Sequence, residues 1–177
     1  VFAFKVPAYQ GYVTDQALIL GSADRQVMES ASVALAKKSG VQVATLVVKS
    51  LDGITVEEAA LKVFETWGIG QKGKDNGVLF LISVEDRKLR VEVGYGLEGT
   101  LNDGKVGALL DEKVLPYFRD RQLAQGIVSG HVALVQTIDP EVSVSIQPPR
   151  PTPVNAPKGE DNIVVAGLVL GVVVLMM

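Results

Sequence analysis

Two long stretches of the chain are apolar at nearly every position, which is typical of strands buried on both faces of a sheet. They are residues 41–48 and 77–84, and both are rich in β-branched side chains. Residues 89–93 instead alternate between apolar and charged side chains, directly after the turn-forming run Glu85-Asp-Arg-Lys88. We therefore expect a third strand that pairs antiparallel with the second as a hairpin.

Four other segments place apolar residues at helical spacing. The first follows a capping Ser22, and the second follows the capping box Thr55-Val-Glu-Glu58. The last two cover about residues 104–118, with Pro116 bending the end, and 121–138. The order helix, strand, helix, strand, strand, helix, helix predicts an α/β fold, a three-layer α/β/α sandwich around a short mixed sheet.

The last predicted helix carries two unusual features. Gly126 and Gly130 lie four residues apart, where each glycine destabilises a helix by roughly 1 kcal/mol relative to alanine, so we expect close packing there. His131 is the only histidine and shares a face with apolar residues. A buried, hydrogen-bonded histidine is the expected interpretation, and a general acid–base role is the alternative.

The composition divides the chain into four parts. Residues 1–11 are an N-terminal segment that we expect to follow a removed signal peptide, and residues 12–139 form the domain. Residues 140–161 are rich in proline and predict a semi-rigid linker. Residues 162–177 have no polar side chain after Asn162 and predict a C-terminal transmembrane helix of roughly 24 Å. The alternative for this last segment is a buried strand or helix of the domain.

The charges that flank the predicted membrane helix bear on its orientation. The preceding residues include Lys158, Glu160 and Asp161, with no positive excess. Positive charge marks the cytoplasmic flank of a membrane helix, so this flank favours the other side. We therefore expect a single-pass protein of the cell membrane whose domain lies on the extracytoplasmic side, periplasmic or lumenal.

Composition also excludes several classes of partner and chemistry. The formal net charge of −3 argues against binding to nucleic acid, which requires a basic face. The chain has no cysteine, so thiolate catalysis and thiolate metal sites are excluded. Two G-x-G-x-x-G matches, at residues 68–73 and 94–99, lack the strand and helix context of a dinucleotide site. We expect no nucleotide cofactor.

Two glycine-rich stretches hold the candidate chemistry. If the predicted hairpin forms, Asp75 and Asn76 at the start of one strand lie near Glu92, Tyr95 and Glu98 at the end of the other. Asp103 follows at the start of a helix. Carboxylate, amide and backbone oxygens are the ligands that Ca²⁺ and Mg²⁺ prefer, and glycines let the backbone present carbonyls. The alternative is that residues 75–77 only form a turn and that Asp103 only caps a helix.

These same stretches resemble the motifs of the TPM domain family. The matching runs are Tyr12-Val-Thr-Asp15, Trp67-Gly-Ile-Gly70, Asp75-Asn-Gly-Val-Leu79, Asp86-Arg-Lys88 and Val91-Glu-Val-Gly-Tyr-Gly-Leu-Glu-Gly99. One departure is Thr14, where the family commonly has asparagine. The resemblance implies an exported α/β domain on a membrane helix, and divalent metal binding at Asp75, Asn76, Glu92, Glu98, Asp103 and Asp15.

The resemblance also implies two possible functions. The first is a tethered accessory or maintenance factor that binds Ca²⁺ or Mg²⁺ and docks on a membrane protein complex, with Tyr95 and Gly96 in the binding surface. The alternative is a weak metal-assisted acid phosphatase, with Lys72, Lys74 or Arg87 facing phosphate. Neither glycine-rich stretch contains a serine or cysteine nucleophile, so enzymatic activity stays open.

Overall fold

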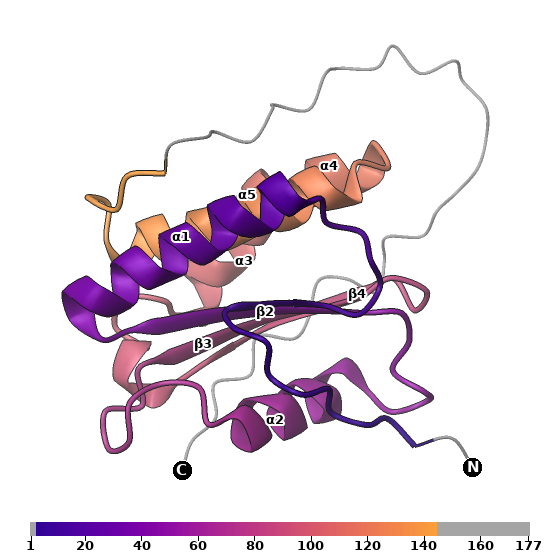
Figure 1. The fold of residues 1–177 in the computed structure, drawn as a ribbon, viewed down its shortest axis with the longest axis horizontal. Helices are drawn as coiled ribbons and strands as arrows, with labels where there is room; N and C mark the ends of the chain where they lie inside the picture. Colours follow the sequence, from indigo (N-terminus) through magenta and orange to yellow (C-terminus); the bar gives the residue numbers. More distant parts are fainter. Residues whose placement is uncertain (1–2, 145–177) are drawn as a thin grey trace.

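Four strands form a single mixed sheet in the computed structural model, which describes residues 3–144 (Figure 1). The strands are β1 (Val13–Asp15), β2 (Gln42–Val48), β3 (Gly77–Ser83) and β4 (Lys88–Val93), in that spatial order. The first three run parallel, and β4 is antiparallel to β3. The predicted mixed sheet and hairpin are confirmed. The three-residue edge strand β1 was not predicted, because it is too short to show a period.

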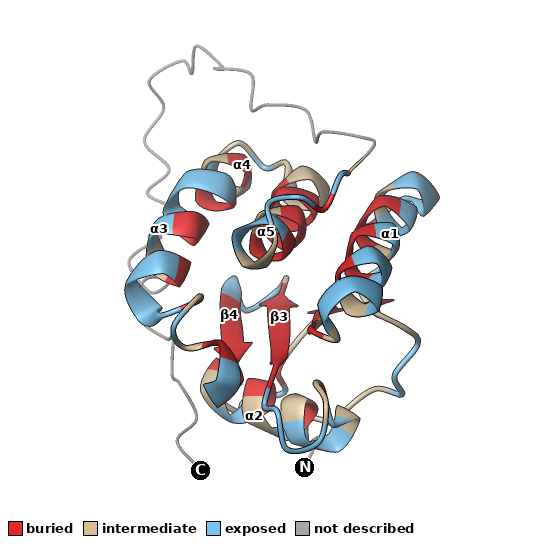
Figure 2. Ribbon diagram, turned by 90° about the vertical axis from the view of Figure 1, so that its left-hand side faces the viewer, coloured by how far each residue is buried: buried red, intermediate tan, exposed pale blue. Residues whose placement is uncertain are grey.

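Helices cover both faces of the sheet and make three layers (Figures 1 and 2). The helix α2 (Val56–Trp67) lies on one face. The opposite face is covered by α1 (Ser22–Ser39), α3 (Asp103–Lys113), α4 (Leu115–Arg119) and α5 (Leu123–Ile138). A single 3-10 turn, η1 (Tyr95–Leu97), leads from β4 towards α3.

The apolar runs over residues 41–48 and 77–84 are explained by strands whose successive side chains point alternately into two apolar cores. Val78, Phe80 and Ile82 of β3 belong to the larger core beneath α1 and α5. Leu79 and Leu81 of the same strand belong to the smaller core beneath α2. Because successive residues of a strand point to opposite faces, a strand between two helical layers is apolar at every position.

The predicted helix over residues 104–118 is two helices. The helix α3 ends at Lys113, and α4 begins at Leu115 with Pro116 in its first turn. Proline has no N–H to donate and its ring collides with the preceding turn, so the chain restarts as a new helix at this point. The proline therefore breaks the segment, where the sequence predicted only a bend.

The predicted close packing of the glycines in α5 is confirmed. A Cβ placed on Gly130 would lie 2.6 Å from Cγ2 of Val114 and 2.9 Å from Cε1 of Phe80. A Cβ on Gly126 would lie 2.6 Å from Cε1 of Phe118. The helix therefore approaches β3 and α4 more closely than any larger residue allows.

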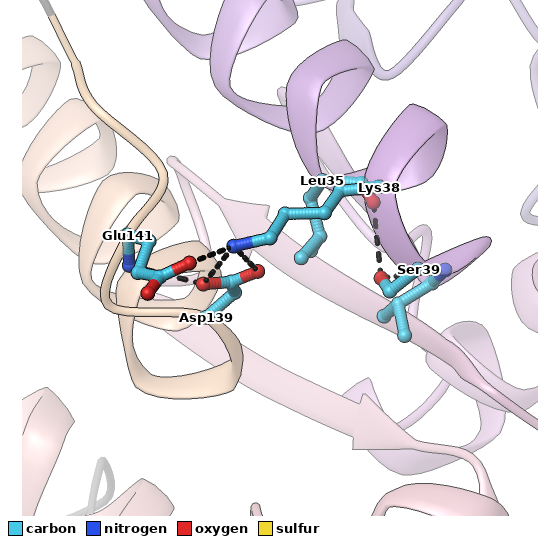
Figure 3. Close-up of polar contacts among 6 residues, drawn as sticks. Leu35, Lys38, Ser39, Asp139 and Glu141 are labelled. Carbon is cyan, nitrogen blue, oxygen red and sulfur yellow. Dashed lines mark hydrogen bonds and ion pairs between the residues drawn. The ribbon is translucent and has the colours of Figure 1, made fainter.

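The end of α5 is tied to the end of α1 by an exposed lysine (Figure 3). The Nζ atom of Lys38 lies 2.8 Å from Oδ2 of Asp139, and it also pairs with Glu141. These ion pairs join the first helix of the domain to the segment where the chain leaves it. Residues 145–161 of the predicted linker, and the whole of the predicted membrane helix over 162–177, lie outside the described residues. No helix within residues 3–144 is both long and apolar enough to span a membrane.

Candidate functional site

Two glycine-rich loops meet at one end of the sheet. We call residues 68–76, between α2 and β3, the glycine loop, and residues 94–99, after β4, the tyrosine loop. Because β3 and β4 are antiparallel, the start of β3 lies beside the end of β4. The backbone N–H of Gly94 donates to the carbonyl of Gly77 at 2.8 Å, and that of Gly96 donates to the carbonyl of Asp75 at 3.0 Å. The predicted juxtaposition of these loops is therefore confirmed.

The contact between the loops requires glycine in the tyrosine loop. A Cβ on Gly94 would lie 2.2 Å from the carbonyl oxygen of Asp75, and a Cβ on Gly96 would lie 2.1 Å from that of Lys74. Both distances are far below van der Waals contact, and the obstructing atoms are backbone. The two glycines thus hold the loops together as one unit, which we call the two-loop surface.

Asn76 closes the glycine loop from inside. Its Oδ1 accepts from the backbone N–H of Gln71 at 2.7 Å, and its Nδ2 donates to Oε1 of Gln71 at 3.1 Å. Its backbone carbonyl accepts from the N–H of Gln42, at the start of β2. The Asn76 side chain is buried, so its amide shapes the loop and is not presented on the surface.

The outer side of the two-loop surface combines an aromatic ring with charges. Tyr95 is 58% exposed, and Lys74, Asp75 and Gly96 are exposed beside it in the two loops. Glu98 is half-buried and lies directly after η1. Asp75 adopts a left-handed conformation with φ 49°, which turns the chain just before β3. These residues form a polar patch around one projecting tyrosine.

Asp103 follows the two-loop surface in the chain, as the first residue of α3. Its side chain is exposed. The helix is capped by Asn102, whose Oδ1 accepts from the N–H of Lys105 at 3.0 Å. The cap is therefore the residue before Asp103, and the Asp103 carboxylate is placed favourably in the positive first turn of the helix.

Glu92 lies beneath α2 and faces away from the two-loop surface. Its Oε2 accepts from Nε of Arg90 at 2.9 Å, and both side chains are 1% exposed. Burial raises the pKa of the Glu92 carboxyl, and the hydrogen bond from Arg90 opposes that rise. Within the described chain, Oε1 of Glu92 has no hydrogen-bond partner. Glu92 belongs to a buried ion pair of the smaller core.

Asp15 and Arg87 lie at the opposite end of the sheet. Asp15 ends β1, and its carboxylate accepts from the N–H groups of Ala17 at 3.1 Å and Leu20 at 2.7 Å. Arg87 lies in the β3–β4 turn with φ 53°. The seven residues of β3 separate this end from the two-loop surface, a distance of about 20 Å. Neither side chain reaches the predicted site.

The six predicted ligands are thus spread over three places. Asp75 and Glu98 remain on the two-loop surface, with Asp103 on the helix that follows. No group of three or more acidic or histidine side chains that could hold a metal ion occurs among residues 3–144. A cation at the two-loop surface therefore needs oxygen ligands besides the side chains of the six predicted residues, because Ca²⁺ takes six to eight oxygen ligands.

His131 is a structural residue in the larger core. It is fully buried, with Nδ1 2.8 Å from Oγ1 of Thr45 and Nε2 2.9 Å from Oγ of Ser32 and 3.0 Å from the carbonyl of Met28. A carbonyl only accepts, so we assign the proton to Nε2 and let the Thr45 hydroxyl donate to Nδ1. Burial lowers the pKa of His131 to about 4. The hydrogen bond to the backbone carbonyl of Met28 raises this pKa, but by less than burial lowers it. The ring is out of reach of any substrate.

The sequence placed Asp86 in a turn and in the family motif Asp86-Arg-Lys88, and the structure shows that this residue also joins two loops. Its Oδ2 accepts from the N–H of Leu51 at 2.7 Å and from the hydroxyl of Ser83 at 2.6 Å. The Ser83 hydrogen bond is the largest of the effects that lower the pKa of this carboxyl. Asp86 thereby fixes the β2–α2 loop to the hairpin. The sequence gives no signal for a contact between residues 35 positions apart.

The fold defines a small α/β domain whose four-stranded mixed sheet lies between two helical layers, with the two-loop surface at one end. The chain belongs to the TPM domain family, whose model matches residues 13–137. No curated protein matches the sequence.

Solved structures of three bacterial proteins are similar to this chain. The N-terminal domain of a protein from P. gingivalis is 32% identical with a TM-score of 0.68, and the match covers 74% of this chain and 83% of that one. An N-terminal domain from Corynebacterium glutamicum is 17% identical with a TM-score of 0.56, covering 82% and 90%. A protein from the psychrophilic bacterium Bizionia argentinensis is 18% identical with a TM-score of 0.58, covering 73% and 88%. The last two likenesses concern the fold alone.

Proposed function

We propose that this TPM domain is a binding module that docks on a membrane protein complex through the two-loop surface. One observation carries the proposal: Tyr95 is 58% exposed, between two glycines whose backbones pack against the glycine loop and donate hydrogen bonds to Asp75 and Gly77. An exposed aromatic ring on a preorganised loop is typical of an interface anchor, because it buries a large area with little loss of conformational entropy. The surrounding charges would form the polar rim.

A divalent cation, Ca²⁺ or Mg²⁺, is the second part of the proposal. Asp75 and Glu98 are the carboxylates that the two-loop surface offers, and no basic side chain is paired with either among the described residues. Two carboxylates fill only part of the coordination shell of a hard cation. Water would complete the shell in the free domain, so we expect low-affinity but saturable binding there, and tighter binding when a partner adds oxygen ligands.

The placement of the module is also a proposal, and it rests on the sequence. The apolar residues 162–177 would anchor the chain, and the proline-rich residues 140–161 would hold the domain off the bilayer on its extracytoplasmic side. Such a tether keeps the two-loop surface at a high local concentration near other membrane proteins. The proposal includes a role as an accessory or maintenance factor for such a membrane complex, which the resemblance to the family implies.

Docking is tested by site-specific photo-cross-linking in native membranes. A photoreactive phenylalanine analogue replaces Tyr95 in one variant and Leu18 in the other. Leu18 is the matched control, since it is 78% exposed and lies at the other end of the sheet. We expect a discrete adduct with a membrane protein from position 95 that position 18 does not give. Equal labelling from both positions, or none from position 95, would contradict the proposal.

Cation binding is tested by calorimetric titration of the 177-residue chain, in a mild detergent, with Ca²⁺ and with Mg²⁺. The variants are Asp75→Asn and Glu98→Gln, and the control is Glu112→Gln, an exposed carboxylate on α3. We expect saturable binding that both site variants lose and the control keeps. No heat of binding at millimolar metal would remove the cation from the proposal and leave docking intact.

A weak metal-assisted acid phosphatase is the alternative function. The exposed Lys72 and Lys74 beside Asp75 favour it, because cations stabilise the charge that develops on a transferring phosphoryl group. A phosphate-ester assay on the same samples separates the two. Metal-dependent turnover that Asp75→Asn abolishes would support the phosphatase, and binding without turnover supports the module.

A further inference from the structure

The first residues of the chain form an extended arm, residues 3–9, that lies on the α2 side of the sheet. In Figure 1 the indigo segment passes from the N-terminal end across α2 to the edge of the sheet. Phe4 and Val6 are half-buried and pack against the smaller core, while Lys5 between them is exposed. The arm therefore presents alternate side chains to the domain, as an extended peptide does in a binding groove.

The arm ends on the chain's only tryptophan. The indole N–H of Trp67, the last residue of α2, donates to the carbonyl of Pro7 at 2.8 Å. The ring of Tyr9 packs edge-on against Trp67 with centroids 5.2 Å apart. Burial raises the pKa of the Tyr9 hydroxyl to about 12, and Tyr12 and Glu29 add to the rise. Domains that bind proline-containing peptides likewise hold them in grooves lined by aromatic side chains.

The arm covers a part of the sheet that α2 leaves open. The helix α2 lies over β3 and β4 (Figure 2). Ala44, Leu46 and Val48 of β2 point to the same face and belong to the same core as Phe4 and Val6. The sheet thus has an apolar strip beside α2, which a short peptide covers in place of a second helix. We call this strip, together with Trp67, the arm seat.

The arm is attached by few bonds. Residues 3–9 have no helix or strand, and in the described part of the chain their hydrogen bonds are limited to that between Trp67 and Pro7. Two half-buried apolar side chains, the edge-on contact of Tyr9 with Trp67 and one hydrogen bond hold the arm. Each buried apolar side chain contributes about 1.5–3 kcal/mol at most, and an aromatic pair adds about 0.5–1.5 kcal/mol. Within the described chain, the arm thus lacks the ladder of backbone hydrogen bonds that holds each strand of the sheet.

We propose that the arm seat is a peptide-binding site, filled in cis by the arm, that takes an extended partner segment of the form apolar, any residue, apolar, proline. The pattern matches what the arm presents: Phe4, Val6 and then Pro7. Gly11, at the base of the arm, has φ 115° and turns the arm back onto its own domain. That turn favours occupation by the same chain over exchange of arms between two copies.

Competition between arm and partner sets how tightly a partner binds. The tethered arm is present at an effective concentration in the millimolar range, so it reduces the apparent affinity of any free segment. If the seat is free only about a tenth of the time, the apparent Kd rises about tenfold. Weakening the arm should therefore expose the site and strengthen binding in trans.

Trp67 supplies a direct readout, because it is the only tryptophan. The arm-weakened variant carries Phe4→Ser and Val6→Ser, and the control carries Lys5→Ser at the exposed position between them. The probe is a free peptide of residues 3–9, which contains no tryptophan. We expect the weakened variant to show a red-shifted Trp67 emission that the peptide reverses saturably, with a Kd at least about tenfold lower than for wild type or control.

Two further peptides test the assigned pattern. One carries serine in place of both apolar residues and should not bind, and the other carries leucine and isoleucine there and should bind. Circular dichroism checks that the weakened variant is folded, and the free energy of unfolding is measured beside it. A folded, weakened variant that binds no peptide would overturn the site. Binding of the arm sequence alone, or a wild-type dimer in gel filtration, would overturn the assignment of a partner segment.

Discussion

Gly96 and Gly99 lie three residues apart in the tyrosine loop and differ in what surrounds them. A Cβ on Gly96 would lie 2.1 Å from a backbone oxygen, whereas nothing lies within 4 Å of one on Gly99. We predict that Gly96→Ala lowers the free energy of unfolding by roughly 1–3 kcal/mol, because the two loops must separate. Gly99→Ala should change it by less than about 0.5 kcal/mol. Urea unfolding of both variants measures the difference.

The same pair of variants bears on function. If the two-loop surface acts as a unit, Gly96→Ala should also weaken the cation binding and the cross-link proposed for this surface, and Gly99→Ala should keep both. Equal stability of the two variants would show that the loops tolerate a side chain between them, contrary to the packing described.

His131 makes the stability of the domain depend on pH. Its pKa is about 4 in the folded protein and about 6.5 in an unfolded chain. Between these values the unfolded state binds the extra proton, so stability is complete above about pH 6.5 and falls as the pH falls towards 4. The loss amounts to about 3 kcal/mol over this window.

The measurement is the free energy of unfolding at several pH values between 7 and 4. Because the chain has no other histidine, His131→Gln should be less stable at pH 7 but should lose less stability on acidification than the wild type. Parallel pH profiles for the two proteins would contradict the assignment of a neutral, buried ring.

At the scale of elements, the packing of α5 depends on a glycine that helix propensity disfavours. Gly130→Ala would place a methyl group 2.6 Å from Val114 and 2.9 Å from Phe80. We predict a loss of roughly 1–3 kcal/mol, which outweighs the gain in helix propensity. The matched Gly107→Ala in α3 has nothing within 4 Å and should stabilise by about 0.5–1 kcal/mol. Thermal unfolding of both variants should therefore shift in opposite directions, and a gain in both would refute the close contact.

The elements that the sequence predicted well are those with a strong local signal. The runs over β2 and β3 are buried on both faces, so their continuous apolar character predicted them directly. The caps at Thr55 and Gly68 marked both ends of α2. β1 gave no signal, since it has three residues and only one is a large apolar residue. Its strand conformation depends on the pairing with β2.

At the scale of the whole molecule, the two parallel crossovers differ in hand. The strands β1, β2 and β3 follow one another across the sheet in one direction, yet α1 lies on one face and α2 on the other. Helices on opposite faces then require crossovers of opposite hand, whereas right-handed crossovers are the general rule. As a consequence, α2 is the one helix of the described chain on its face of the sheet, and the arm of residues 3–9 covers the part of that face beside α2.

The ion pairs of Lys38 are a whole-molecule contact, joining residues about a hundred positions apart. Hydrogen bonds to Asp139 and Glu141 raise the pKa of Lys38, and Lys38 lowers that of Asp139. We predict that Lys38→Met leaves the midpoint of unfolding nearly unchanged, because exposed ion pairs contribute little. Hydrogen exchange in residues 139–144 should become faster, and high salt should have the same effect on the wild type. Unchanged exchange would mean that apolar packing alone holds this segment.

The sequence by itself determined the class of fold, the helix α2 with both its caps, the two buried strands and the juxtaposition of the two loops. All of these depend on local periodicity or on a hairpin, in which neighbours in space are also neighbours in the chain. The sequence misplaced the cap of α1, which is Gly21 and not Ser22, and it did not separate α3 from α4.

Only the tertiary structure decided which side chains share a place. Glu92 turned inward to Arg90, Asp15 and Arg87 lie about 20 Å from the two-loop surface, and Asn76 closes a loop. The face to which a side chain points, and the end of the sheet where it lies, depend on the strand order and on which helix covers which face. Local sequence patterns predict neither the strand order nor the face that each helix covers.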